Sequence, residues 1–203
     1  MTEPRVEIFD QVTCYAGFFR MERYRLRHRL FDGSWSPTLT RELFERGHAA
    51  AVLLYDPIRD AVVLVEQFRI GALEHPDGPW LQEIVAGIID DANATPEEVA
   101  RREAIEEANC PIQDLVHIYD YYVSPGGTSE RISLFCGQVD VTGVGGLHGL
   151  AEESEDIRVT VVPFAEAVAR MQAGQINSAA PIIALQWLQL HHAEVRARWS
   201  RAT

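Results

Sequence analysis

Residues 5–35 alternate between apolar or aromatic side chains and arginine, a pattern that predicts antiparallel β-strands. From Tyr24 to Leu30, every second position is tyrosine, leucine or histidine, and arginine occupies each position between them. A period of two places successive side chains on opposite faces of a strand. We expect these strands to end at the Asp32-Gly33 turn. A sheet this small cannot bury its own faces, so it is expected to pack on another element or another subunit.

The remainder of the chain gives strand patterns on both sides of one short helix pattern, followed by two more helix patterns. Apolar runs bounded by turn residues predict strands at 49–55, 61–68, 80–86, 119–123, 131–139 and 157–162. Helices are expected at 164–173, where Gly174 ends the pattern, and at 181–192. This order predicts an α+β fold, with the weakest order in 71–78, in 143–149 and at the C-terminal tail.

The short helix pattern begins after Thr95 and carries an unusual cluster of carboxylates. Thr95, Pro96 and Glu98 form a helix-start signal, with threonine as the N-cap and glutamate three residues later. The carboxylates of the next turns fall on one flank of the helix and are those of Glu103, Glu106 and Glu107. Two such charges ~4 Å apart repel by roughly 4 kcal/mol at an effective dielectric near 20. The helix therefore either spreads its carboxylates in water or holds a cation between them.

The segment from Gly87 to Cys110 resembles the signature of the Nudix hydrolase family, Gly-x5-Glu-x7-Arg-Glu-U-x-Glu-Glu-x-Gly-U, in which U is aliphatic. The matching positions are Gly87, Arg102, Glu103, Glu106 and Glu107. Asn93 replaces the first glutamate, the loop before the helix has one extra residue, and Asn109 replaces the late glycine. Asparagine can adopt the left-handed conformation that glycine would supply, so the helix end is expected to survive. Arg102 is expected to brace the loop and the helix through the carboxylates.

Two later loops make the resemblance more specific. The turn sequence from Ser124 to Glu130 is Ser-Pro-Gly-Gly-Thr-Ser-Glu, and Pro125 lies 16 positions beyond Asn109. A second loop, 148–156, has four carboxylates within five residues. On their own they also fit a tight turn and an ordinary charged loop. Together they resemble the bacterial ADP-ribose pyrophosphatase subfamily of the Nudix family, and the resemblance extends over nearly the whole chain.

The resemblance implies a fold, a domain division and an activity. The expected fold is a mixed β-sheet sandwiched between helices, with an N-terminal antiparallel β-sheet extension. Residues 1–47 would form a strand region for dimerisation and residues 48–203 the Nudix domain, giving a domain-swapped homodimer. The implied reaction is hydrolysis of ADP-ribose to AMP and ribose 5-phosphate with more than one Mg²⁺ or Mn²⁺ ion. Divalent ions suit this chemistry because they neutralise a diphosphate and lower the pKa of bound water.

The resemblance also implies roles for individual residues. It makes Glu153 the general base. The metal-binding positions would be the carbonyl of Ala86 and the carboxylates of Glu103, Glu107, Glu106 and Glu155. The substrate-binding positions would be Phe18, Phe19, Arg41, Arg46, Arg69, Ile88, Ser124, Gly126 and Glu130, with Phe18 or Phe19 stacking on adenine.

Composition narrows the classes of partner and compartment. The net charge of −12 argues against nucleic-acid binding, and no apolar run is long enough to predict a membrane span. All 18 basic residues are arginine, so an anionic substrate would be held by arginine or by metal. No signal-peptide pattern is present and the three cysteines form no metal-like spacing, which predicts a cytoplasmic protein. The pair His191-His192 is expected to be solvated at a helix end.

Two other functions remain open on the sequence alone. The carboxylate helix cannot distinguish one base from another, so the substrate could be another nucleoside-diphosphate sugar, such as a GDP-sugar. A non-catalytic sensor of ADP-ribose belongs to a different class of protein. The complete Arg-Glu-x-x-Glu-Glu core and the acidic loop argue against the sensor.

Overall fold

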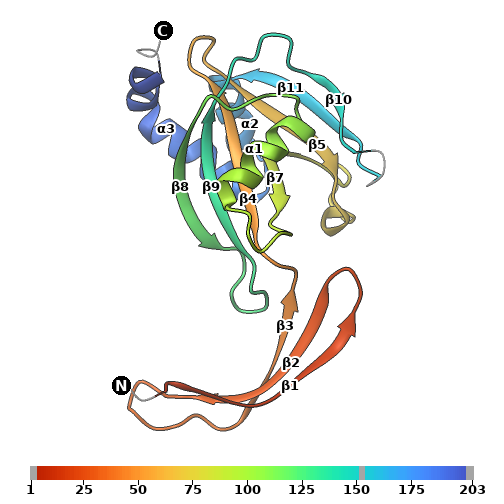
Figure 1. The fold of residues 1–203 in the computed structure, drawn as a ribbon, viewed down its shortest axis with the longest axis vertical. Helices are drawn as coiled ribbons and strands as arrows, with labels where there is room; N and C mark the ends of the chain where they lie inside the picture. Colours follow the sequence, from red (N-terminus) through yellow and green to blue (C-terminus); the bar gives the residue numbers. More distant parts are fainter. Residues whose placement is uncertain (1–3, 151–153, 200–203) are drawn as a thin grey trace. The chain divides into compact units, whose positions relative to one another are not determined.

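The computed structural model describes residues 4–150 and 154–199, and the chain divides into two compact units. The N-terminal unit comprises Met1–His48 together with Tyr122–Arg131, and the larger unit comprises Ala49–Tyr121 together with Ile132–Thr203. Figure 1 labels the elements of both units.

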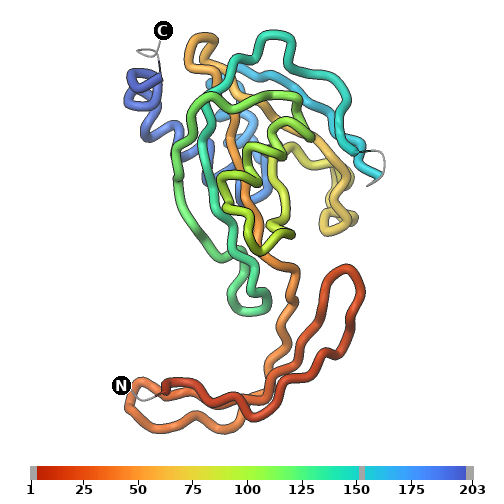
Figure 2. Tube along the Cα trace, viewed as in Figure 1, coloured from red at the N-terminus to blue at the C-terminus, as the bar shows by residue number. Residues whose placement is uncertain are grey.

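The N-terminal unit is built on one antiparallel sheet of three strands in the order β1-β2-β3. These are β1 (Val6–Ala16), β2 (Arg20–His28) and β3 (Leu39–Glu45). Figure 2 follows the β1–β2 hairpin in red, which closes through the turn at residues 17–19. The expected turn at Asp32-Gly33 is present, where the Asp32 carboxylate accepts a hydrogen bond from the Ser34 N–H at 2.8 Å. The antiparallel extension predicted from the alternation is therefore confirmed, whereas β3 was not predicted.

The larger unit contains a mixed sheet in the order β10-β11-β5-β4-β9-β8, in which β6 also pairs with β5 and β7 with β4. The pairing of β4 with β9 is parallel, while β4–β5, β4–β7, β5–β6 and β5–β11 are antiparallel. The strands are β4 (Ala49–Asp56), β5 (Ala61–Phe68), β6 (Trp80–Glu83), β7 (Val85–Ile88), β8 (Asp114–Tyr122), β9 (Arg131–Gln138), β10 (Gly146–His148) and β11 (Ile157–Pro163). The helices are η1 (Ile70–Ala72), α1 (Pro96–Glu106), α2 (Phe164–Gln172) and α3 (Ala179–Trp199).

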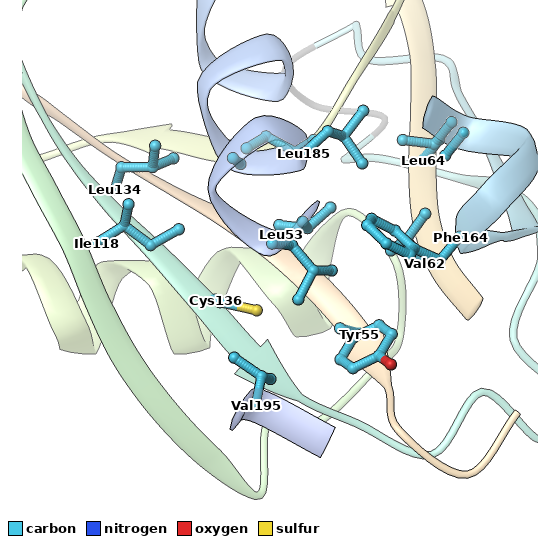
Figure 3. Close-up of a cluster of buried hydrophobic side chains, with 14 of the residues drawn as sticks. Leu53, Tyr55, Val62, Leu64, Ile118, Leu134, Cys136, Phe164, Leu185 and Val195 are labelled. Carbon is cyan, nitrogen blue, oxygen red and sulfur yellow. The ribbon is translucent and has the colours of Figure 1, made fainter. Parts of the chain in front are cut away.

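Strand β4 lies in the middle of this sheet and is buried along its whole length. Its alternate residues serve two different cores, because successive side chains point to opposite faces. Ala50, Val52 and Leu54 pack in the cluster that includes the buried face of α1. Leu53 and Tyr55 belong to the other cluster, which includes residues of α2 and α3 and is drawn in Figure 3. The sheet is thus sandwiched between helices, which confirms the predicted α+β fold.

Several predicted boundaries were wrong in detail. The strand expected at 80–86 is two strands, because the chain changes partner at Ile84 from β5 to β4. Strand β10 lies within 143–149, where we expected weak order, and is held there by pairing with β11. The last helix is longer than predicted at both ends. No helix in the described ranges has the length and apolarity needed to cross a membrane.

His192 does not form part of a solvated pair, so that expectation was wrong. Its Nε2 lies 2.6 Å from Asp60 Oδ1 and 3.0 Å from the Tyr55 hydroxyl. Its ring also stacks on Phe164, with ring centroids 4.8 Å apart. These contacts attach α3 to the turn between β4 and β5. They join residues more than 130 positions apart in the chain, which a local pattern cannot reveal.

Candidate active site

Helix α1 is fixed at both ends by local interactions that were predicted from the sequence. The Thr95 side chain accepts a hydrogen bond from the Glu98 N–H, and the Glu98 carboxylate accepts one from the Thr95 N–H, forming a capping box. At the other end, Asn109 has φ +45°, in the left-handed region. The Cys110 N–H then donates to the Ala104 carbonyl at 2.9 Å, which closes the last turn.

Two of the three clustered carboxylates of α1 are turned toward the sheet. Glu107 is only 3% exposed, and its Oε2 accepts a hydrogen bond from the Ala86 N–H at 3.2 Å. The Glu103 side chain, 13% exposed, lies against Gly87, where an added Cβ would clash with the carboxylate. Both contacts join α1 to β7. A solvated helix face is therefore excluded for Glu103 and Glu107.

The surroundings of Glu107 favour a cation. The pKa of Glu107 is raised to about 8, first by burial and then by the negative charges of Glu103 and Glu155, against the opposing effects of the Ala86 N–H and Arg69. A carboxylate in this environment holds a proton near neutral pH unless a positive charge takes the proton's place. A divalent cation bound there would displace the proton and offset the repulsion between carboxylates.

Arg102 forms ion pairs with carboxylates of α1 and of the loop before it. Its guanidinium lies 2.9 Å from Glu103 Oε1, 2.9 Å from Glu106 Oε2 and 3.8 Å from Asp90 Oδ1. Because Asp90 belongs to the loop before α1, Arg102 braces that loop and the helix as predicted. Glu106 is engaged mainly with Arg102 in this arrangement.

The available donors fit a hard cation such as Mg²⁺. All are oxygen atoms, and Mg²⁺ commonly uses one or two carboxylates and keeps several waters. Of the predicted metal positions, Ala86, Glu103 and Glu107 come together where α1 meets β7, and the charge of Glu155 acts on Glu107. Within residues 4–150 and 154–199, no group of three or more His, Cys, Asp or Glu side chains could hold an ion by itself. Backbone oxygen and water would have to complete the coordination.

Two predicted substrate-binding residues lie in the same unit as these carboxylates. Arg69 follows the last residue of β5, and its Nε donates to Glu83 Oε2 at 2.6 Å. Ile88 is the last residue of β7 and is partly buried. Glu83 was not singled out from the sequence, since neither its spacing nor its neighbours in the chain mark it.

The N-terminal unit contains the other predicted substrate-binding residues. Arg46 stacks over the Phe19 ring at 5.1 Å and lies 3.4 Å from the buried carboxylate of Glu130. Phe18 is 87% exposed in the β1–β2 turn, and Arg41 is exposed on β3. The last two predicted substrate-binding residues of this unit, Ser124 and Gly126, are exposed in a loop. This unit thus brings Phe19, Arg46 and Glu130 together. It also contains a residue that the sequence did not single out, Phe44, whose ring packs edge-on against Phe19.

The predicted general base, Glu153, lies outside the described residues. Its described neighbours in the chain, Leu150 and Glu155, bind each other through two hydrogen bonds. The Leu150 N–H donates to Glu155 Oε2 at 3.3 Å, and the Glu155 N–H donates to the Leu150 carbonyl at 3.2 Å. The role assigned to Glu153 therefore stays a prediction.

A cavity of about 730 Å³ lies away from α1 and β7, around the β4–β5 turn and the end of α3. Its charged groups already bind one another. Arg59 pairs with Asp56 and Asp140, and Arg198 pairs with Asp114. A cavity whose charges are already paired offers little to an ionic ligand, so the α1–β7 contact is the better candidate for chemistry.

The close approach of Gly87 to Glu103 leads to a direct test. We expect Gly87→Ala to push the Glu103 carboxylate aside and weaken Mn²⁺ binding at least about tenfold, the scale seen when groups that orient ligands are removed. Electron paramagnetic resonance titration of the substrate-free protein with Mn²⁺ measures this. Gly71→Ala is the matched control, because a Cβ there meets no atom within 4 Å. Equal Mn²⁺ affinity in both variants would contradict the assignment of Glu103.

Comparisons with known proteins identify the family of this chain. The NUDIX domain family model matches residues 45–197. The chain is 51% identical to the ADP-ribose pyrophosphatase of Escherichia coli strain K12 over 195 residues, covering 96% of this chain and 93% of the relative. It is 46% identical to the ADP-ribose pyrophosphatase of Haemophilus influenzae, covering 97% and 92%.

Two further likenesses are more distant. A GDP-mannose pyrophosphatase of Cronobacter sakazakii is 40% identical over 152 residues, which are 74% of this chain and 78% of the relative. The solved structure described as an ADP compounds hydrolase superposes with a TM-score of 0.69 at 18% identity, covering 97% of this chain and 99% of that one, and supports the fold alone. From the matched domain and the extent of these identities, the chain belongs to the Nudix family.

Proposed function

We propose that this protein hydrolyses the pyrophosphate bond of ADP-ribose, giving AMP and ribose 5-phosphate, with Mg²⁺ or Mn²⁺ as cofactor. The observation that carries the proposal is the buried carboxylate pair Glu103 and Glu107 held against β7. The choice of ADP-ribose is supported by the relatives named ADP-ribose pyrophosphatase, which are 46–51% identical over almost the whole chain. The GDP-mannose pyrophosphatase of C. sakazakii is less identical and covers less of the chain.

In this proposal the residues of the larger unit hold the ions and the diphosphate. Glu103, Glu107 and the carbonyl of Ala86 bind metal, with Glu155 and Glu106 as further carboxylates. When bound, the ions neutralise the diphosphate and make a water molecule more acidic. Arg69 binds a phosphate oxygen through its guanidinium, which suits bidentate contact with phosphate.

Glu153 is proposed as the general base. It accepts a proton from the water that attacks one phosphorus atom of the diphosphate. The bond from that phosphorus to the bridging oxygen breaks, so that the two phosphates leave as AMP and ribose 5-phosphate. Glu153 is two residues before Glu155 in the sequence, and the charge of Glu155 acts on buried Glu107, which supports this assignment.

Recognition of the nucleoside and of the terminal ribose is assigned to the other predicted residues. The aromatic rings of Phe18 and Phe19 offer faces on which adenine can stack, and Arg46 and Glu130 supply charge beside Phe19. The remaining contacts are proposed for Arg41, Ile88, Ser124 and Gly126.

We further propose that the protein is a domain-swapped homodimer formed through the N-terminal unit. Its sheet is a single layer with many large apolar side chains exposed, among them Val6, Ile8, Phe9, Val12 and Tyr15. Exposed apolar surface of this kind marks a protein interface. A cytoplasmic location is proposed because Cys14, Cys110 and Cys136 are all free thiols, as expected in a reducing compartment.

The substrate proposal is tested with a panel of ADP-ribose, GDP-mannose, NADH and a dinucleoside polyphosphate, each with Mg²⁺. We expect kcat/KM for ADP-ribose to exceed the others by at least about tenfold, because polar contacts to the correct base and ribose are lost with the wrong compound. A preference for GDP-mannose would favour the alternative of a GDP-sugar pyrophosphatase. Binding of ADP-ribose without turnover of any compound would favour a sensor.

The role of Glu153 is tested by Glu153→Gln. We expect kcat to fall by at least about 10²-fold, the low end for loss of a general base, while Mn²⁺ affinity stays near that of the wild type. Glu152→Gln, which changes the adjacent carboxylate, is the control and should retain activity. A Glu153→Gln protein with near-normal turnover would rule out this base.

The dimer is tested by light scattering, which should give about twice the mass of one chain. The double variant Ile8→Glu/Val12→Glu places two carboxylates on β1. It should shift the protein toward monomer, because these carboxylates would be buried in the interface without partners. Ile58→Glu, at another exposed apolar residue that lies in the larger unit, should leave the mass unchanged. A wild-type protein that is fully active as a monomer would contradict the proposal.

A further inference from the structure

The ion pair of Arg69 and Glu83 lies on the same face of the sheet as α1. Strands β5 and β6 are antiparallel, and Val65 is the cross-strand partner of Glu83. Directly opposed residues of two paired strands point to the same face. Val65 belongs to the core cluster that contains the buried residues of α1, so Glu83 faces the helix as well. Arg69 lies four residues beyond Val65. Because side chains alternate between faces along an extended chain, an even separation places Arg69 on the same face as Val65.

The guanidinium of Arg69 is held from one edge only. Its Nε donates to Glu83 Oε2 at 2.6 Å, and the Glu83 side chain is only 16% exposed. The backbone is also fixed, because the Arg69 N–H donates to the Pro79 carbonyl at 2.8 Å. Within the described ranges, the structure records no hydrogen bond from the two Nη nitrogens of Arg69. A planar guanidinium bound at Nε thus presents its Nη edge to other partners.

Without its ion pair with Glu83, Arg69 would compete with a cation for the carboxylate of Glu107. Glu107 lies close to this segment of the sheet, because its Oε2 accepts a hydrogen bond from the N–H of Ala86, three residues beyond Glu83, and the positive charge of Arg69 lowers its pKa. Yet the recorded ion pair of Arg69 is with Glu83, and none with Glu107 is recorded among the described residues. An arginine that paired with Glu107 in a bidentate fashion would occupy both carboxylate oxygens. Those oxygens would then be unavailable to a cation.

We propose that Glu83 is a positioning residue that holds Arg69 away from Glu107. The carboxylate of Glu107 thereby stays available to a divalent cation, and the Nη edge of Arg69 stays available to a diphosphate. The second part rests on the proposed function, whereas the first concerns metal binding by the protein alone. Glu83 itself binds no metal in this arrangement, because its carboxylate is engaged with Arg69.

The test is Mn²⁺ binding to the substrate-free protein, followed by electron paramagnetic resonance, with Mn²⁺ alone as the probe. We expect Glu83→Gln to weaken Mn²⁺ binding about tenfold, because the released Arg69 pairs with Glu107. Arg69→Ala should not weaken it. The double variant Glu83→Gln/Arg69→Ala should recover the affinity of Arg69→Ala, since the competing guanidinium is gone.

Glu66→Gln is the matched control. Glu66 lies on the same strand, pairs with Arg158 at 2.8 Å, and its cross-strand partner on β6 is Gln82, next to Glu83. One position from Val65, it points to the opposite face of the sheet, so its loss should leave Mn²⁺ affinity unchanged. Should Glu83→Gln fail to fold, Glu83→Asp is the second variant. Its shorter side chain should give a smaller loss, again removed by Arg69→Ala.

Three results would overturn the inference. The first is wild-type Mn²⁺ affinity in Glu83→Gln, and the second is a wild-type protein that binds no Mn²⁺. The third is a double variant as weak as Glu83→Gln, which would make Glu83 a ligand or a purely structural residue. Steady-state kinetics keep the two proposals apart. If the wild type binds Mn²⁺ as expected but does not hydrolyse ADP-ribose, the proposed function fails and the role of Glu83 stands.

Discussion

The contact between α1 and β7 is the constraint on which the site depends. It buries the carboxylate of Glu107 beneath the Ala86 N–H and places Glu103 directly on the backbone of Gly87. Burying a charged carboxylate costs several kcal/mol, so the contact persists only if the rest of the fold supports it. Small residues of α1, Ala100 and Ala104, supply that support, because they are fully buried in the core and let the helix lie close to the sheet.

The same constraint supports the proposal that these carboxylates bind a cation. The charges of Glu103 and Glu155 act on buried Glu107 through a medium that screens poorly, and both make its negative charge less favourable. Part of the folding free energy is therefore spent on repulsion. A ligand that removes this repulsion binds the folded state selectively and stabilises it by mass action. The carboxylates thus couple metal binding to the stability of the α1–β7 contact.

Local signals in the sequence predicted the parts of the structure that depend on neighbouring residues. The capping box at Thr95 and the left-handed Asn109 involve groups within a few positions of each other, and both were confirmed. The alternation that marks β1 and β2 is equally local. Long-range pairings were not predictable in this way. Strand β3 was missed because its pairing with β2 is set by the sheet and not by its own pattern.

In the candidate site, too, features set by neighbouring residues were predicted from the sequence and long-range contacts were not. Glu103 and Glu107 were singled out by their position on one flank of a helix together with the Nudix resemblance, and the structure brings both to β7. Glu83 was missed, although it binds Arg69, because the two residues meet only when β5 and β6 pair. Burial could not be predicted either, since nothing in Glu-x-x-Glu-Glu says which carboxylate turns inward. The structure distinguishes buried Glu107 from Glu106, which lies at the surface with Arg102.

The chemistry and the choice of substrate place different demands on this chain. ADP-ribose and a GDP-sugar present the same charged diphosphate, so carboxylates, metal and Arg69 cannot tell them apart. Discrimination requires groups that contact the base or the terminal sugar, where a wrong partner leaves buried polar groups unpaired. In the proposed function, this task falls to the cluster of Phe19, Arg46 and Glu130, in which the stacking and the ion pair hold Arg46 in place. A rigid arginine beside an aromatic face loses little entropy on binding, which favours specificity for the ligand that it contacts.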